Sequence, residues 1–514
     1  MLADNENIII INCGSQFTQL IARRLREMKV HSVIFNWDAD IGKIKSCSPK
    51  GIIISGGPDS VNDPDAITIA PEIISLGCPV MGICYGMQLL AKMTGGTVIS
   101  GHVREYGVTE IHKAGGDSVI LSENIPDTGR VLMSHGDNVA ELPPGFRATS
   151  LTDTGIIASI EDTSRNFYGL QFHPEVVSTE SGNYILRNFA FTVCKCHGDW
   201  NLSNWVDSTI AAIRETVGDS KVVCGLSGGV DSSVAATLVH KAIGDNLQCV
   251  FVNHGLMRLN EPESVMKEYE NIGLNVKYVD ASEIFLRELD GVTDPEKKRK
   301  IIGRLFIEVF DGEAKKIDGA EWLLQGTIYP DVIESGTKKG SALIKSHHNV
   351  GGLPEKMNLK LLEPLRDLFK DEVRRLGKII GMPDEIISRQ PFPGPGLAVR
   401  CLGAVTKERL DTLRKADAIF REELKKAGLY SGIWQAFCVL LPVKSVGVMG
   451  DSRTYNEAVV LRAIHSQDAM TAEWSRIDYD VVDRVSKRIC NEVPGINRVV
   501  MDVTSKPPAT IEWE

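Results

Sequence analysis

A cysteine between two glycines is the first residue of this chain that could act as a nucleophile. Cys84 lies in the run G-I-C-Y-G at 82–86, after an apolar strand expected over 80–83 and before a helix expected from Met87. The glycines allow the sharp turn that exposes the central side chain. The N-terminus of a helix stabilises negative charge, so a thiolate here could attack a carbonyl carbon. Taken alone, the pattern fits a buried structural cysteine equally well.

Two further motifs supply partners for this thiol. His173 and Glu175 lie in F-H-P-E at 172–175, after another apolar strand, so the carboxylate can orient the imidazole as a base against Cys84. The turn S-G-G-P at 55–58 offers the backbone N–H of Gly57, which could pair with that of Tyr85 as an oxyanion hole. An ordinary β-turn explains this last motif as well. The three motifs together predict a Cys–His–Glu triad.

A second candidate site is a loop rich in glycine and serine, between a strand expected over 221–225 and a helix expected over 235–242. Backbone N–H groups, hydroxyls and a helix N-terminus together bind anions. The loop contains no lysine and lacks the Walker pattern, so cleavage at a γ-phosphate is not expected. A turn that merely caps a helix is the alternative. The loop consists of Ser227, Gly228, Gly229, Val230, Asp231, Ser232 and Ser233.

The elements that position these residues are predicted to form several domains, because 514 residues exceed one hydrophobic core. Short apolar strands alternate with amphipathic helices from residue 8 to 93 and again from 221 to 325, which is typical of parallel α/β sheets. A proline and glycine cluster at 391–396 interrupts the second series. We predict two successive doubly wound parallel-sheet domains, 7–196 and 197–389, followed by a small α+β domain, 390–514.

Composition excludes several classes of protein. Hydrophobic residues make up 43% and charged residues 24%, as in globular chains, and the net charge of -10 argues against nucleic acid as a partner. No apolar run approaches the roughly 20 residues of a membrane span, and the polar N-terminal residues do not resemble a signal peptide, so we expect a cytoplasmic protein with no membrane partner. Its 11 cysteines are then reduced thiols. The run C-K-C-H at 194–197 lacks a second ligand cluster, which disfavours a zinc site.

The triad motifs, in this order, resemble the class I glutamine amidotransferase domain over about residues 7–196. The resemblance implies that Cys84 forms a glutamyl thioester, that His173 transfers a proton to the departing ammonia, and that Glu175 holds His173. His135 is a tempting second base in M-S-H-G-D at 133–137. The family has a similar surface loop there, so no catalytic role is assigned to His135.

The glycine-serine loop resembles the PP-loop of the ATP pyrophosphatases. In that family the loop binds the β- and γ-phosphates as leaving pyrophosphate while Mg²⁺ neutralises their charge, and Asp231 is expected to help hold the metal. Such chemistry suits the replacement of a carbonyl oxygen by an amine. Adenylylation turns the oxygen into a leaving group, and ammonia then displaces AMP. Because free ammonia is mostly protonated at neutral pH, releasing it locally from glutamine supplies the reactive form.

The whole chain resembles bacterial GMP synthases. The resemblance rests on the order and spacing of four segments, at 326–335, 344–352, 391–396 and 504–514. It implies a homodimer, formed through the C-terminal domain, that consumes glutamine, ATP and xanthosine monophosphate (XMP). Of the basic run 297–300, three residues are expected to face solvent and one to bind nucleotide. The family's XMP contacts fall on Arg299, Gln435, Asp451, Lys506 and Glu512.

Four positions depart from that family's pattern. Asn12 stands where an aspartate is usual, Asn253 and His254 replace Asp-Asn, and Gln390 replaces an aromatic residue or histidine. Asn253 and His254 lie where adenosine would bind, so ATP affinity is the property most affected. Two alternatives remain open at this point. One is an ATP-driven amidotransferase for another nucleotide or a nicotinate precursor, and the other is a non-catalytic nucleotide sensor.

Overall fold

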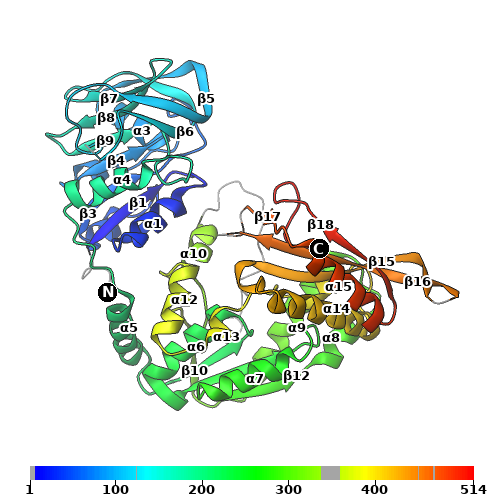
Figure 1. Cartoon of the computed structure of the whole chain (residues 1–514). Helices are drawn as coiled ribbons and strands as arrows, with labels where there is room; N and C mark the ends of the chain where they lie inside the picture. Colours follow the sequence, from blue (N-terminus) through cyan, green and yellow to red (C-terminus); the bar gives the residue numbers. More distant parts are fainter. Residues whose placement is uncertain (1–5, 123, 337–358, 450, 467–468, 470) are drawn as a thin grey trace. The chain divides into compact units, whose positions relative to one another are not determined.

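The computed structural model describes residues 6–122, 124–336, 359–449, 451–466, 469 and 471–514. It contains two compact units, Met1–Asn204 with Pro330–Ala342, and Trp205–Tyr329 with Leu343–Glu514 (Figure 1). The division into three domains at residues 197 and 390 stays a prediction. No helix formed by the described residues has both the length and the apolar character that a membrane span requires.

The first unit is built on a nine-stranded sheet with the order β2-β1-β3-β4-β9-β8-β7-β5-β6. The first five strands pair in parallel, and the other four extend the sheet with antiparallel pairs. The strands are β1 (Asn7–Asn12), β2 (His31–Asn36), β3 (Pro49–Ile54), β4 (Val80–Ile83), β5 (Thr97–Lys113), β6 (Thr128–Glu141), β7 (Arg147–Thr152), β8 (Ile157–Asp162) and β9 (Phe167–Leu170). The helices are α1 (Thr18–Glu27), α2 (Ile41–Ser46), α3 (Tyr85–Met93) and α4 (Gly182–Arg187).

The apolar runs of the sequence become the buried strands of this sheet. All four residues of Ile8–Ile11 are fully buried, as expected for a parallel strand covered on both faces. Helix α1 turns Ile21, Ala22 and Leu25 inward, three or four residues apart on one face. The parallel half of the sheet therefore follows from the sequence pattern, and its carboxyl ends carry the candidate triad.

The second unit contains a five-stranded, wholly parallel sheet with the order β12-β11-β10-β13-β14. Because β10 lies between strands whose connections run in opposite directions, its carboxyl end is a topological switch point, where α/β sheets bind ligands. The strands are β10 (Lys221–Leu226), β11 (Leu247–Asn253), β12 (Val276–Asp280), β13 (Ala320–Leu324) and β14 (Lys360–Leu362). The helices are α5 (Leu202–Val217), α6 (Val230–Ile243), α7 (Glu261–Asn271), α8 (Ser282–Glu288), α9 (Pro295–Ala314), α12 (Lys370–Ile379) and α13 (Asp384–Ile387). Helix α10 (Tyr329–Gly336) follows β13 in the chain, but its residues from Pro330 onward belong to the first unit.

A smaller sheet completes the second unit. In it β15 and β16 form a long antiparallel hairpin, and β18 pairs with β16 in parallel. One hydrophobic core runs from the five-stranded sheet into this part, through Phe310, Leu397, Phe420 and Val459. The remaining elements are α14 (Lys407–Lys426), β15 (Gln435–Met449), β16 (Ser452–His465), β17 (Glu473–Trp474), α15 (Tyr479–Glu492) and β18 (Ile496–Asp502). The predicted fold class is confirmed.

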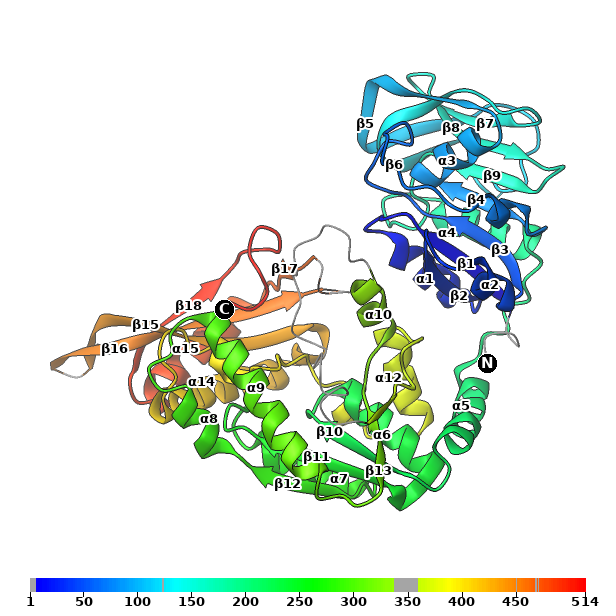
Figure 2. The same ribbon diagram turned by 180° about the vertical axis from the view of Figure 1, so that it is seen from behind.

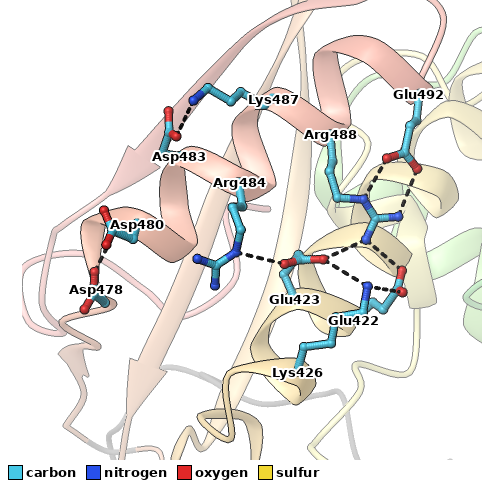
Figure 3. Close-up of polar contacts among 10 residues, drawn as sticks. All are labelled: Glu422, Glu423, Lys426, Asp478, Asp480, Asp483, Arg484, Lys487, Arg488 and Glu492. Atoms are coloured by element: carbon cyan, nitrogen blue, oxygen red, sulfur yellow. Dashed lines mark hydrogen bonds and ion pairs between the residues drawn. The ribbon is translucent and has the colours of Figure 1, made fainter.

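Helices α14 and α15 are joined by a group of ion pairs (Figure 3). Arg488 bonds to Glu422 and Glu423 on α14 at 2.9 and 2.8 Å, and to both carboxylate oxygens of Glu492 on its own helix. Lys426 and Arg484 also contact these α14 carboxylates. A network centred on one guanidinium fixes geometry better than isolated surface pairs do.

Candidate active sites

The turn around Cys84 is enforced by close backbone packing. Cys84 has a φ of +52° between β4 and α3, which begins two residues earlier than predicted. A Cβ added to Gly82 would lie 2.3 Å from the carbonyl oxygen of Gly86, and one added to Gly86 would lie 2.2 Å from that of Ile54. No side chain fits at either glycine, so the turn that holds Cys84 requires both of them.

The predicted triad residues come together in the first unit. His173 follows β9, and its Nδ1 lies 2.8 Å from Glu175 Oε1. The Glu175 side chain is fully buried, and Arg24 Nε donates to its backbone oxygen at 3.1 Å. The Cys84 side chain lies close enough to His173 to affect the pKa of its imidazole, and the thiol donates to the carbonyl oxygen of Ser134 at 3.5 Å. Thiol, imidazole and carboxylate thus form one row, as in nucleophile–base–acid triads.

The surroundings of His173 favour its protonated form. Burial by itself lowers the pKa of this imidazole, but hydrogen bonds and charge interactions with Cys84 and Glu175 outweigh burial and raise the pKa to about 10. A protonated His173 beside Cys84 places a proton next to the candidate nucleophile, where a leaving amine could take it.

Gly57 and Tyr85, whose backbone N–H groups are predicted to form an oxyanion hole, lie in segments that contact each other. A Cβ added to Gly57 would be 3.2 Å from the Tyr85 ring and 2.6 Å from the backbone oxygen of Cys13. Neither backbone N–H makes a hydrogen bond within the described residues. Both therefore remain available to an oxyanion.

His135 is not in a surface loop, so the expectation of a surface loop at this position was wrong. It lies in β6 and is buried, because the long β5–β6 pairing extends the sheet over it. Its ring nitrogens lie 3.2 Å from Glu105 Oε2 and 3.0 Å from the carbonyl oxygen of Asp137. Burial lowers the pKa of His135 despite the nearby Glu105 charge. Protein partners occupy both ring nitrogens, which agrees with a role outside the triad chemistry.

The glycine-serine loop joins β10 to α6 at the switch point of the second sheet. Gly228 has a φ of +75°, and α6 begins at Val230, earlier than predicted. The hydroxyls of Ser227 and Ser232 lie 3.2 Å apart on the open side of the loop. Ser233 is buried, and its hydroxyl bonds to Tyr269 and to a loop carbonyl instead. The loop thus presents the hydroxyls of Ser227 and Ser232 and the N-terminus of α6, while the buried Ser233 hydroxyl supports the loop backbone.

Lys370 is a candidate site residue that the sequence did not indicate. It is the first residue of α12, and its Nζ lies 2.5 Å from Asp231 Oδ2. The loop lacks a lysine of its own, and only the fold brings this one to it from 139 positions away. A cation here can meet phosphate oxygens as well as Asp231. No local motif around Lys370 indicates this placement.

Asp231 is suited to hold Mg²⁺. Its Oδ1 has no hydrogen-bond partner among the described residues, although it is buried, while Oδ2 faces Lys370. Mg²⁺ bound with nucleotides commonly takes only one or two carboxylates, the rest of its ligands being phosphates and water. In the part of the chain that the structure describes, no three His, Cys, Asp or Glu side chains gather as a metal site. The donor set therefore fits a metal that enters with a phosphate ligand.

Two of the predicted nucleotide contacts lie side by side near the chain terminus. Gln435 Nε2 donates to Glu512 Oε1 at 3.0 Å and to the carbonyl oxygen of Pro391 at 3.0 Å. Arg400, which is fully buried, holds the same Glu512 carboxylate. Buried atoms of this group lack partners among the described residues, namely Gln435 Oε1 and Arg400 Nη1. Arg400 was not predicted from the sequence, since its neighbours in the chain are apolar.

The basic run on α9 behaves differently from the prediction. Arg299 bonds to the backbone oxygen of Glu514, but Lys298, expected in solvent, is completely buried. Its Nζ contacts Glu514 Oε2 at 2.5 Å and the carbonyl oxygens of Ala398 and Cys401. The last residue of the chain offers the carboxylate that makes burial of a lysine possible. The sequence of α9 by itself gives no indication that Glu514 will pair with Lys298.

The structure does not gather the remaining predicted nucleotide contacts. Lys506 Nζ donates to the carbonyl oxygen of Ala469 at 2.8 Å. Asp451 is exposed at the turn of the β15–β16 hairpin, whereas Gln435 pairs with Ile464 at the other end. The XMP contacts of Lys506 and Asp451 stay predictions. The segment 344–352, which carried part of the family resemblance, lies outside the described residues.

The departures from the family pattern all find protein partners. Asn12 Oδ1 accepts hydrogen bonds from Gly14 N–H and from the Thr18 hydroxyl at 3.0 Å each. The amide oxygen therefore ties the end of β1 to the residues that follow it. Asn253 Nδ2 donates to Tyr278 at 2.8 Å. Burial and the charge of a nearby arginine lower the pKa of His254 to about 4. These residues are therefore accommodated within the fold.

Three family descriptions match successive parts of the chain. They are "Glutamine amidotransferase class-I" over residues 9–193, "NAD synthase" over 202–301 and "GMP synthase C terminal domain" over 422–513. The first contains the triad row and the second contains the glycine-serine loop. The third contains Gln435 and Glu512.

Curated relatives match from end to end. Proteins named glutamine-hydrolysing GMP synthase from Aquifex aeolicus and Geobacillus kaustophilus are each 56% identical to this chain, over 507 and 512 residues. The one from Brachyspira hyodysenteriae is 54% identical over 511 residues. Each match covers 99% of this chain and 99% or 100% of the relative. The chain therefore belongs to the family of glutamine-hydrolysing GMP synthases.

Proposed function

We propose that this chain converts XMP, ATP, glutamine and water into GMP, AMP, pyrophosphate and glutamate. One observation carries the proposal: a chain similar to GMP synthases over its whole length contains a thiol–imidazole–carboxylate row in one unit and a lysine-free phosphate loop in the other. The row suits the release of ammonia from an amide, and the loop suits the departure of pyrophosphate. The chemistry needs both.

Release of ammonia begins with the Cys84 thiolate. It attacks the side-chain carbonyl of glutamine, and the N–H groups of Gly57 and Tyr85 bind the oxygen that becomes negative. His173 gives its proton to the amine nitrogen as the C–N bond breaks, which leaves a glutamyl thioester on Cys84. His173 then takes a proton from water, and the hydroxide releases glutamate. Glu175 keeps the ring of His173 oriented throughout.

Activation of XMP takes place at the PP-loop. The 2-oxygen of the xanthine ring attacks the α-phosphorus of ATP, and the bond to pyrophosphate breaks. The loop residues 227–233 and Lys370 bind the departing phosphates. Asp231 would hold Mg²⁺ together with the phosphates, and the bound metal would neutralise the phosphate charge. Ammonia then attacks the ring carbon that bears the adenylyl group, AMP leaves, and the nitrogen remains as the 2-amino group of GMP.

The XMP contacts are proposed at Arg299, Gln435, Asp451, Lys506 and Glu512. Support is strongest for Gln435 and Glu512, because they touch each other beside buried polar atoms that have no partner among the described residues. Asp451 lies apart from them, at a hairpin turn. A neighbouring subunit would be needed to bring it to a site.

A homodimer through the C-terminal part is proposed on the same grounds. The β15–β16 hairpin projects from the second unit (Figures 1 and 2), and Val446, Val448 and Tyr455 on it are exposed by 55%, 75% and 59%. Exposed apolar side chains on a projecting ribbon favour burial against another protein surface. Cytoplasmic location, and the absence of nucleic-acid and membrane partners, also remain proposals.

The test is an assay of the purified protein with XMP, Mg·ATP and glutamine. Equal amounts of GMP, AMP and glutamate are expected. Parallel reactions replace XMP with inosine monophosphate, uridine triphosphate or nicotinate adenine dinucleotide, and none of these should support formation of AMP and glutamate. AMP formation that depends on the nicotinate dinucleotide rather than on XMP would refute the proposal.

A further inference from the structure

The guanidinium of Arg389 holds the backbone of the PP-loop. Its Nη1 donates to the carbonyl oxygen of Gly228 at 2.6 Å, and its Nη2 donates to Glu268 Oε2, on α7, at 2.7 Å. The Arg389 and Glu268 side chains are only 15% and 17% exposed. Two partners in different directions fix the plane of the guanidinium, so the Gly228 carbonyl meets a rigid donor rather than water.

This contact sets the direction of a donor in the loop. The peptide bond between Gly228 and Gly229 is planar and trans, and in such a bond the C=O and the N–H point in opposite directions. Because Arg389 holds the Gly228 oxygen, the Gly229 N–H is turned away from Arg389. Among the described residues, that N–H meets only Ser227 Oγ, at a long 3.3 Å. It is thus a donor that a phosphate oxygen can take over.

The next residue, Gln390, holds the backbone on both sides of Gln435. Its Nε2 donates to the carbonyl oxygens of Ile433 and Tyr430, at 3.0 and 3.2 Å, and its Oε1 accepts from Ala436 N–H at 2.9 Å. Gln390 is 5% exposed, so these bonds lie away from solvent. Both amide protons and the amide oxygen are engaged, which fixes the start of β15.

We propose that Arg389 and Gln390 form a mechanical link through which ATP at the PP-loop and XMP at Gln435 and Glu512 strengthen each other's binding. Consecutive Cα atoms are separated by about 3.8 Å, so the groups that the two side chains hold cannot shift independently. Pro391 follows and removes one backbone rotation. Neither Arg389 nor Gln390 touches a substrate in this scheme; both are positioning residues.

The inference rests on the proposed function, because it takes Gln435 and Glu512 as XMP contacts. It adds that the two ligands bind cooperatively and that two specific side chains carry the coupling. Cooperativity between two ligands is reciprocal, so each must change the affinity of the other by one common factor. That equality gives the experiment an internal check.

Calorimetric titration of the full chain measures this factor. The probes are XMP and Mg·α,β-methylene-ATP, which cannot release pyrophosphate, each titrated alone and in the presence of the other. The wild-type affinities should rise by a common factor of about 5- to 150-fold. In Arg389→Lys and Gln390→Met the factor should fall to within about twofold of one. If the two residues were merely structural, the substitutions would change the affinity for each ligand alone. The factor by which one ligand raises the affinity of the other would then stay at its wild-type value.

Matched controls separate the link from general effects of substitution. Arg375→Lys alters an exposed arginine on α12, and Gln248→Met alters a glutamine on β11 whose side-chain hydrogen bonds, among the described residues, go to Asp245 and Asn275. Both should retain the wild-type factor. If Gln390→Met folds poorly, Gln390→Glu keeps the volume and the acceptor for Ala436 N–H but loses both donors, and it should show the same loss.

The outcomes distinguish this inference from the proposed function. Wild type that binds both probes with no mutual effect would overturn the link, and so would variants that keep the full factor. Wild type that binds the ATP analogue but not XMP would refute the proposed function, and the link would be withdrawn with it. The link is supported if the Arg389 and Gln390 variants lose the cooperativity factor while the control variants keep it.

Discussion

Arg400 and Glu512 form a two-point ion pair inside the second unit. Nε lies 2.9 Å from Oε2, and Nη2 lies 2.8 Å from Oε1. Arg400 is fully buried, with its guanidinium 4.0 Å from the centre of the Phe437 ring. The chain terminus is thereby fixed to the strand that carries Gln435. A flexible carboxylate near the end of a chain becomes a rigid part of the proposed XMP site.

Replacement of Arg400 by lysine should weaken XMP binding. Lysine keeps the charge but cannot make the paired bonds, so the Glu512 carboxylate is no longer held in one orientation. The loss of one charge-assisted bond, about 1.5–3 kcal/mol, corresponds to roughly 10- to 150-fold in affinity. Calorimetric titration with XMP checks this. Arg484→Lys, on the exposed face of α15, should bind XMP normally, and an unchanged affinity in Arg400→Lys would contradict the role given to the pair.

Asp231→Asn should slow GMP synthesis from glutamine and from ammonium salts alike. Asparagine keeps the size of the side chain but removes the charge that faces Lys370 and the proposed Mg²⁺. A fall of about 10- to 150-fold in rate is expected from the loss of one charged interaction. AMP formation with each nitrogen source measures it. Asp231 would lose its assigned role if the ammonium-dependent rate stayed at the wild-type level.

His254 should make the second unit sensitive to acid. Its pKa is about 4 in the folded protein, lowered by burial and by the charge of Arg414, against 6.5 for an unperturbed imidazole. Between these values the unfolded chain binds the extra proton, so stability falls as the pH drops from about 6.5 to 4, by roughly 1.4 kcal/mol per pH unit.

Urea unfolding at pH 7 and pH 5 tests this sensitivity. Wild type should lose about 2 kcal/mol between the two conditions through His254, and His254→Asn should lose correspondingly less. His465→Asn, which alters an exposed histidine at the end of β16, should keep the wild-type pH dependence. An equal loss in wild type and His254→Asn would show that other groups cause the acid sensitivity.

Arg488→Gln should destabilise the second unit by about 1–2 kcal/mol, because Arg488 links carboxylates on two helices (Figure 3). Lys487→Gln is the matched control. In the part of the chain that the structure describes, Lys487 pairs only with Asp483 on its own helix, and both side chains are mostly exposed, so its removal should cost less than about 0.5 kcal/mol. Thermal unfolding at low and high salt measures both, and the Arg488 effect should shrink at high salt. Equal effects of the two substitutions would contradict the network's role.

Local sequence signals predicted the catalytic turns but not their long-range partners. Gly82 and Gly86 around Cys84 correctly indicated a strand–turn–helix segment, because the glycine requirement is local. Lys370 and Lys298 were missed or misplaced, since their partners, Asp231 and Glu514, lie more than a hundred residues away. Which charged residue of a helix becomes buried depends on that tertiary partner.

The extent of the first sheet was also hidden from the sequence pattern. The parallel strands β1 to β4 were visible as short apolar runs. Strands β5 and β6 expose one face for much of their length, and their mixed polar sequence gives a weak signal. The loop expected around His135 came from the family resemblance, and the weak strand signal gave no reason to revise it, although His135 lies buried in β6.

The separation of ammonia release from ammonia use is the centre of this account, and Cys84→Ala tests it most directly. GMP formation is measured with glutamine and, in parallel, with an ammonium salt. Cys78→Ala, which alters another thiol of the same unit, serves as the control and should retain both activities. In Cys84→Ala the glutamine-dependent rate should disappear while the ammonium-dependent rate stays at the wild-type level. Loss of both rates in a folded variant, or survival of the glutamine-dependent rate, would contradict the account.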